Sequence, residues 1–171
     1  MQIVKYPDPF LRRATQPVTQ FDAELQALVT SMFEVMYDLR GVGLAGPQVG
    51  LDRRLFVLNP TGDRKDRDQE MAFVNPRILS RGKQLEFGDE GCLSVPGIYA
   101  EVERPHDVVV AYQDVTGAEG ELAADGFLAR IIQHEHDHLE GVLFVDRLTP
   151  VDKIRVRTKL QDLERQAKVR A

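Results

Sequence analysis

Hydrophobic side chains recur at helical spacing between residues 22 and 40, at Leu25, Leu28, Val29, Met32, Phe33, Val35, Met36 and Leu39. Such a broad apolar stripe is typical of a helix that packs one face against a core. Asp22 directly precedes the stripe and suits the N-cap, because its short side chain can accept a bond from a backbone N–H of the first turn. We therefore expect a first helix from about Asp22 to Arg40.

Short apolar runs in the middle of the chain are bounded by proline, glycine or aspartate, which is typical of strands that end in turns. These runs are Arg54–Leu58, Met71–Val74, Gln84–Phe87, Tyr99–Val102 and Val108–Tyr112. Between the first two, residues 60–70 carry many charged side chains, so we expect a solvated loop there.

Two more helices are predicted after the strands. One opens at Asp125, since Phe127, Leu128, Ile131 and Ile132 repeat at helical spacing ahead of residues 133–138. The last begins at about Val151, and its apolar positions form one stripe: Val156, Leu160, Leu163 and Ala167. This order predicts an α+β fold, with antiparallel sheets packed around the helix that carries residues 133–138 and with a C-terminal helix.

Composition favours one soluble domain over residues 1–171, because 43% hydrophobic content in 171 residues can form a real core. The single cysteine rules out an internal disulfide and suits a reducing compartment. No apolar run approaches the roughly 18 residues of a membrane span, and the first residues lack the apolar stretch of a secretion signal. We therefore expect a cytoplasmic protein without a membrane or DNA partner.

The charge is unevenly distributed. Residues 151–171 hold seven basic and three acidic side chains, a balance of +4, so the other 150 residues carry −9 of the chain's net −5. A basic helix on an acidic body can be a solvated face or a surface that binds RNA phosphates.

The run His134-Glu135-x-x-His138 is the most informative chemistry in the chain. On a helix, residues four apart lie on the same face, so both imidazoles can reach one metal ion with Glu135 beside them as a base. Such an ion lowers the pKa of bound water toward about 7. His136 points roughly 160° away from His138, so we interpret it as a structural or surface histidine.

A catalytic site of this kind needs a third protein ligand. Metzincin proteases supply a histidine after a glycine, but here Gly141 is followed by Phe144 at that position. Thermolysin-like proteases use a later glutamate, for which Glu164 is a candidate in a segment that we expect to be exposed. The remaining candidate is Cys92, the only cysteine, which lies in the polar, glycine-containing segment E-G-C-L-S.

Three segments in order, G-V-G-L-A-G-P-Q at 41–48, E-G-C-L-S at 90–94 and Q-H-E-H-D-H at 133–138, resemble the signature motifs of the peptide deformylases. The similarity extends over nearly the whole chain, from Y-P-D-P-F-L-R to the helix after D-R-L-T-P. One residue departs from the pattern, because Gly46 stands where the family usually has alanine. The missing methyl group adds backbone freedom next to Pro47 and Gln48.

The resemblance implies a metal-dependent hydrolase that removes the N-formyl group from the N-terminal formylmethionine of newly synthesised proteins and releases formate. It assigns the metal to Cys92, His134 and His138, with Fe²⁺ expected as the native ion and Zn²⁺, Ni²⁺ or Co²⁺ as alternatives. It also implies that Glu135 moves the proton of the attacking water, and that Gln48 and the Leu93 N–H stabilise the oxyanion.

The resemblance places the substrate as well. Val42, Gly43 and Gly91 match positions that bond an extended peptide as an added strand, while Phe127, Arg130 and Ile131 match the wall of the methionine pocket. Arg130 would contribute its aliphatic stem. Because deformylases act on emerging chains, the basic C-terminal helix is expected to hold the enzyme near the ribosomal exit tunnel.

Three other classes share some of these features. A zincin-type endopeptidase has the helix motif but does not need Cys92. A structural zinc module needs a fourth ligand, and its candidates are poor, since His136 faces away and His106 lies in a predicted surface turn. An inactive relative would not be expected to retain Gln48, Cys92 and Glu135.

Overall fold

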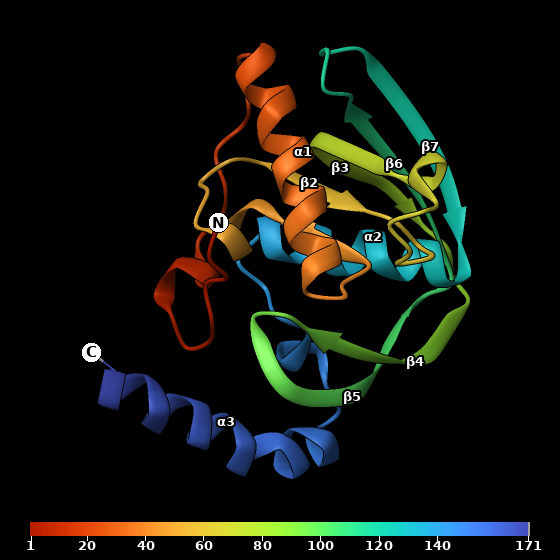
Figure 1. Ribbon diagram of the computed structural model, residues 1–171. Helices are drawn as coiled ribbons and strands as arrows, with labels where there is room; N and C mark the ends of the chain where they lie inside the picture. Colours follow the sequence, from red (N-terminus) through yellow and green to blue (C-terminus); the bar gives the residue numbers. More distant parts are fainter. Residues whose placement is uncertain (171) are drawn as a thin grey trace.

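The computed structural model describes residues 1–170 and shows an α+β fold with two antiparallel sheets and a C-terminal helix, as predicted (Figure 1). Ala171, the end of the predicted domain, lies outside the described residues. The larger sheet has the order β1-β2-β3-β6-β7, with β1 Gly43–Ala45, β2 Leu55–Leu58, β3 Met71–Arg81, β6 Asp107–Gln113 and β7 Glu119–Asp125. The smaller sheet is a hairpin of β4 (Leu85–Cys92) and β5 (Val95–Pro105).

The helices are α1 (Ala23–Asp38), α2 (Gly126–Leu139) and α3 (Pro150–Arg170), with 3₁₀ turns at Pro9–Arg12, Gly46–Val49, Arg67–Gln69 and Phe144–Arg147. Helices α1 and α2 cover opposite faces of the larger sheet (Figure 1). Strand β2 shows why. Leu55 and Val57 join the α1 cluster, whereas Phe56 and Leu58 join the α2 cluster. Side chains alternate between the faces of a strand, so a strand buried on both faces is apolar throughout.

A third hydrophobic cluster lies under the hairpin. Val95, Ile98 and Val102 of β5 pack with Val156 of α3 and with four residues ahead of that helix: Leu143, Phe144, Val145 and Leu148. Leu160 and Leu163 also pack here, so the predicted apolar stripe does dock the last helix, although Ala167 is outside the cluster. Within residues 1–170, no helix is long and apolar enough to cross a membrane.

The predicted elements are present, with shifted bounds. The first helix ends at Asp38 rather than Arg40, because Arg40 has a φ of +57° that a helix cannot contain. Strands β3, β4 and β5 are longer than their apolar runs, since cross-strand pairing extends into polar residues. Strands β1 and β7 were missed. Strand β1 has three residues, and β7 carries three acidic side chains that hide its alternation.

Two predicted helix caps behave differently, and this generates a test. Asp22 caps α1 with a bond from the Leu25 N–H at 3.0 Å, whereas the side chain of Asp125 makes no capping bond to α2. We expect Asp22→Ala to lower the free energy of unfolding by about 1 kcal/mol. The matched Asp125→Ala variant should lower the free energy of unfolding by less, because it removes no capping hydrogen bond. Urea unfolding measures both, and equal losses would contradict the assignment.

Candidate metal centre

Helix α2 carries the His-Glu-x-x-His run on its buried side. Its apolar residues, among them Ile131 and Ile132, pack on the larger sheet, and the same packing buries Glu135 and His138, which are 4% and 1% exposed. Burial lowers the pKa of His138 well below its usual value, so its imidazole is neutral. A neutral imidazole is the form that binds a metal.

Cys92 ends strand β4 and lies beside His134 and His138 of α2. Its Sγ lies 3.3 Å from Nε2 of His138, and the donor atoms of Cys92, His134 and His138 all lie within 4.8 Å of one another. Within residues 1–170, this is the one group of three or more His, Cys, Asp or Glu side chains with that spacing. One free thiol and two imidazoles are a donor set that fits a transition metal ion.

Glu90 fixes how His134 faces this group. Oε2 of Glu90 lies 2.8 Å from Nδ1 of His134, which leaves Nε2 of that ring for the metal position. Burial alone raises the pKa of Glu90, but hydrogen bonds from Arg104 and His134 outweigh burial and lower it to about 2. An ionised carboxylate can only accept, so Nδ1 of His134 is the donor. Carboxylate partners of this kind are common behind metal-binding histidines.

Glu135 lies beside the group without a partner for Oε2, although the atom is buried. Burial raises the pKa of Glu135 to about 7, which suits a group that both accepts and returns a proton near neutral pH. Gly43 makes room for it, because a Cβ there would overlap the Glu135 carboxylate.

Gln48 is 1% exposed and is held by its own turn. Its Oε1 accepts from the Ala45 N–H at 2.8 Å, which directs Nε2 toward Cys92 Sγ at 3.4 Å. The sequence suggested that Gly46 would loosen this turn. Instead the Gly46 carbonyl accepts from the Leu51 N–H at 3.0 Å, and a Cβ at Gly46 would lie 2.7 Å from a backbone oxygen of Arg53. The glycine therefore permits a close backbone approach.

These groups open into a cavity of about 420 Å³. All the predicted site residues other than His138 line it: Val42, Gly43, Gln48, Gly91, Cys92, Leu93, Phe127, Arg130, Ile131, His134 and Glu135. Phe127 is 55% exposed and stands at the rim. The sequence missed other lining residues, among them Arg40, Asp89, Pro96 and Tyr99. They carry no chemical motif and reach the cavity only through folding.

The guanidinium of Arg130 is hydrogen-bonded to the hairpin of β4 and β5. Its Nη1 donates to Oε1 of Glu90 at 3.0 Å and to the Val102 carbonyl at 2.8 Å, and its Nη2 donates to the Glu86 carbonyl at 2.8 Å. With the guanidinium held in this way, the aliphatic stem is the part of Arg130 that is available to the cavity wall.

The sequence also missed Arg104 and Asp137, which contact each other beside the site, where Arg104 also contacts Glu90. A signal for Arg104 existed. Arg104 continues the every-second-residue pattern of Ile98, Ala100 and Val102 on β5, so its side chain points to the same inner face. A charged side chain on that face needs a carboxylate partner.

The excluded candidates lie elsewhere. His136 faces away from Cys92 and lies 3.2 Å from Nη2 of Arg54, although it is buried. His106 lies 2.7 Å from Glu86 at the far end of the hairpin. Glu164 accepts a hydrogen bond from Tyr6 at 2.6 Å and is not part of the group.

Comparison with known proteins shows the family to which this chain belongs. Residues 1–154 match the family model described as Polypeptide deformylase. The chain is 46% identical over 165 residues to the chloroplastic peptide deformylase 1B of Oryza sativa, and 46% identical over 166 residues to the peptide deformylase of Chromobacterium violaceum. It spans 61% of the plant relative's length and 97% of the bacterial one's, and the matches cover 96% and 97% of this chain.

Two solved structures also resemble this chain in fold and sequence. The Arabidopsis thaliana peptide deformylase 1B in complex with an inhibitor has a TM-score of 0.96 and 46% identity, covering 100% of this chain and 94% of that one. The Plasmodium falciparum peptide deformylase has a TM-score of 0.96 and 44% identity, covering 98% of both chains. The family match, the relatives and the grouped motifs together place this chain in the polypeptide deformylase family.

Proposed function

We propose that this protein is a metal-dependent hydrolase that removes the N-formyl group from the N-terminal formylmethionine of newly made proteins and releases formate. The observation that carries the proposal is the convergence of Cys92, His134 and His138 beside the buried carboxylate of Glu135 at the base of a cavity. Membership of the polypeptide deformylase family supports it.

Cys92, His134 and His138 would hold the metal. A divalent ion bound there supplies a Lewis acid that polarises the formyl carbonyl and makes water more acidic. Mixed sulfur and nitrogen donors suit Fe²⁺, which we propose as the native ion, and also accept Zn²⁺, Ni²⁺ or Co²⁺.

The remaining chemistry belongs to the chain's own side chains. Glu135 accepts a proton from the water that attacks the formyl carbon and returns it to the departing amine. Gln48 Nε2 and the Leu93 N–H donate to the oxygen that becomes negatively charged. The bond between Gln48 Oε1 and the Ala45 N–H supports this role, because it leaves the amide nitrogen facing the site.

The sheet edges suggest how the peptide binds. Strand β1 is an edge of the larger sheet, and β4 has one partner, β5. Gly43 begins β1, with Val42 directly before it, and Gly91 lies in β4. All three line the same cavity, so an extended peptide can pair with backbone on both sides. Phe127 and Ile131, with the stem of Arg130, form the apolar wall for the methionine side chain.

The cytoplasmic location stays a prediction from the sequence. The names of the rice and Arabidopsis relatives place those proteins in chloroplasts or mitochondria.

We also propose that α3 binds ribosomal RNA and holds the enzyme near emerging chains. Its stripe around Val156 packs on the body, which leaves the basic side chains Lys153, Arg155, Arg157, Lys159, Arg165 and Lys168 exposed on the other faces. Exposed basic side chains of this density bind phosphate backbones electrostatically.

The first test is formate release from a formyl-Met-Ala peptide by protein purified without oxygen and reloaded with Fe²⁺ or Ni²⁺. Glu135→Ala should lower the rate by about 10²–10⁴-fold, because the proton acceptor is removed. Glu140→Ala is the matched control just after the same helix, since Glu140 contacts Arg54 on the opposite side, and it should retain activity. No formate from folded, metal-loaded wild type would refute the proposed reaction.

The second test separates this site from that of a zincin endopeptidase. Cys92→Ser should weaken Zn²⁺ binding by more than about 100-fold, since a serine hydroxyl stays protonated and removal of an outer partner alone costs 10–100-fold. Chelator competition measures it. Ser94→Ala is the control, because the buried Ser94 hydroxyl has no hydrogen-bond partner. Retained metal with cleavage of internal peptide bonds would favour the endopeptidase.

The third test concerns α3. Deleting residues 153–171 would also remove Val156 from the core, so the double substitution Arg155→Glu with Lys159→Glu is preferable. We expect weaker co-sedimentation with ribosomes at low salt, and a salt dependence whose slope falls by about 1 for each side chain that no longer binds a phosphate. Arg13→Glu with Lys83→Glu makes the same charge change at exposed positions outside α3. Equal effects of the two pairs would refute a specific role for α3.

A further inference from the structure

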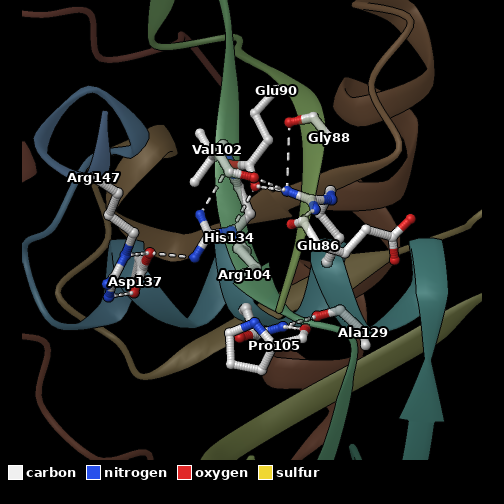
Figure 2. Close-up of polar contacts among 12 residues, drawn as sticks. Glu86, Gly88, Glu90, Val102, Arg104, Pro105, Ala129, His134, Asp137 and Arg147 are labelled. Atoms are coloured by element: carbon white, nitrogen blue, oxygen red, sulfur yellow. Dashed lines mark hydrogen bonds and ion pairs between the residues drawn. The ribbon is translucent and has the colours of Figure 1, made fainter. Parts of the chain in front are cut away.

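A series of buried ion pairs joins the hairpin to α2, and we call it the Arg104 bridge: Glu90, Arg104 and Asp137 (Figure 2). Arg104 donates from Nε to Oε1 of Glu90 at 2.5 Å and from Nη2 to Oε2 at 2.8 Å. Its third nitrogen, Nη1, donates to Oδ2 of Asp137 at 2.9 Å. The Arg104 side chain is 3% exposed, so these bonds form away from water.

Both ends of the bridge reach the metal-binding group. Glu90 lies two residues before Cys92 on β4, and it accepts the Nδ1 proton of His134. Asp137 lies between His134 and His138 on α2. One guanidinium therefore ties the strand that carries the thiol to the helical turn that carries both imidazoles.

Apolar packing does not make this connection. The buried apolar residues of α2 belong to the cluster on the larger sheet, whereas those of β5 belong to the cluster with α3. Among the described residues, neither cluster includes an apolar side chain from the other element. Polar side chains join them instead: Arg104, Arg130, and Gln133, whose Nε2 donates to the Pro105 carbonyl at 2.9 Å.

A bidentate guanidinium–carboxylate pair fixes distance and orientation, which sliding apolar contacts do not. A buried ion pair also contributes little net stability compared with apolar packing. The bridge is therefore suited to setting geometry rather than to holding the fold together.

We propose that Arg104 and Asp137 are positioning residues that set the spacing between Cys92 and the two histidines, so that retention of the metal depends on them. The inference rests on the proposed function, in which these three side chains hold the ion. Arg147 extends the bridge outward, because its Nε and Nη2 donate to Asp137 at 2.5 and 2.6 Å from a side chain that is 42% exposed.

The test uses Co²⁺ as the probe. Wild type, Arg104→Lys and Asp137→Asn are loaded with Co²⁺, and its release to excess chelator is followed through the thiolate-to-cobalt absorption band. Both substitutions roughly preserve side-chain size and keep a polar end group. We expect release about 10-fold faster than from wild type, the lower end of the effect of removing an outer partner. The melting temperature of each metal-free protein is measured in parallel.

Arg54→Met is the matched control. Arg54 also ties α2 to a sheet, through Glu140 Oε1 at 2.6 Å, but on the side away from the metal-binding group. We expect it to lower the melting temperature and leave Co²⁺ release at the wild-type rate. A merely structural role for the bridge predicts instead that release follows the melting temperature in every variant.

Arg147→Met provides a milder variant at a half-exposed position, with release expected between wild type and Asp137→Asn. This keeps the proposal testable if a buried substitution prevents folding. The positioning role is overturned if the folded bridge variants release Co²⁺ at the wild-type rate. It is also overturned if Arg54→Met releases Co²⁺ as fast as the bridge variants do. Wild type that binds no Co²⁺ overturns the metal site and this inference together, whereas the formate assay reports on the reaction itself.

Discussion

The carboxylate of Glu90 is the interaction on which the rest of the site depends. It is buried, yet it stays ionised because Arg104, Arg130 and His134 donate to its two oxygens. Each donor comes from a different position on β5 or α2, so one side chain determines where hairpin and helix meet. A buried charge without these donors would be strongly unfavourable, and the contacts must therefore form together.

Helix α2 shows how a core element can also carry chemistry. Its apolar side chains pack on the sheet and thereby bury Glu135, whose Oε2 has no partner. Such an unpaired buried oxygen costs stability, and one explanation for it is a function that needs the group available. Gly43 on the edge strand β1 leaves the space that this carboxylate occupies. The positions of the sheet, the helix and the Glu135 carboxylate thus depend on one another in this fold.

Much of the fold followed from periodicity. The stripes of α1 and α3 and the apolar run of β2 are local patterns that burial directly requires. Strands β1 and β7 were missed for opposite reasons. Strand β1 is too short for a repeat to be visible, and β7 pairs through its backbone while three of its side chains are acidic. Backbone pairing leaves no trace in side-chain type.

The sequence by itself determined the chemistry that is local to one helix. Residues four apart lie on one face, so the spacing of His134 and His138 with Glu135 required no knowledge of the fold. It also pointed to Cys92, since a lone thiol in a polar segment is unusual. Only the tertiary structure decided the rest. The partner of His134, the bridge through Arg104 to Asp137, and the hairpin bonds of Arg130 join residues up to 44 positions apart. Chain folding sets those distances, and no local rule of spacing encodes them.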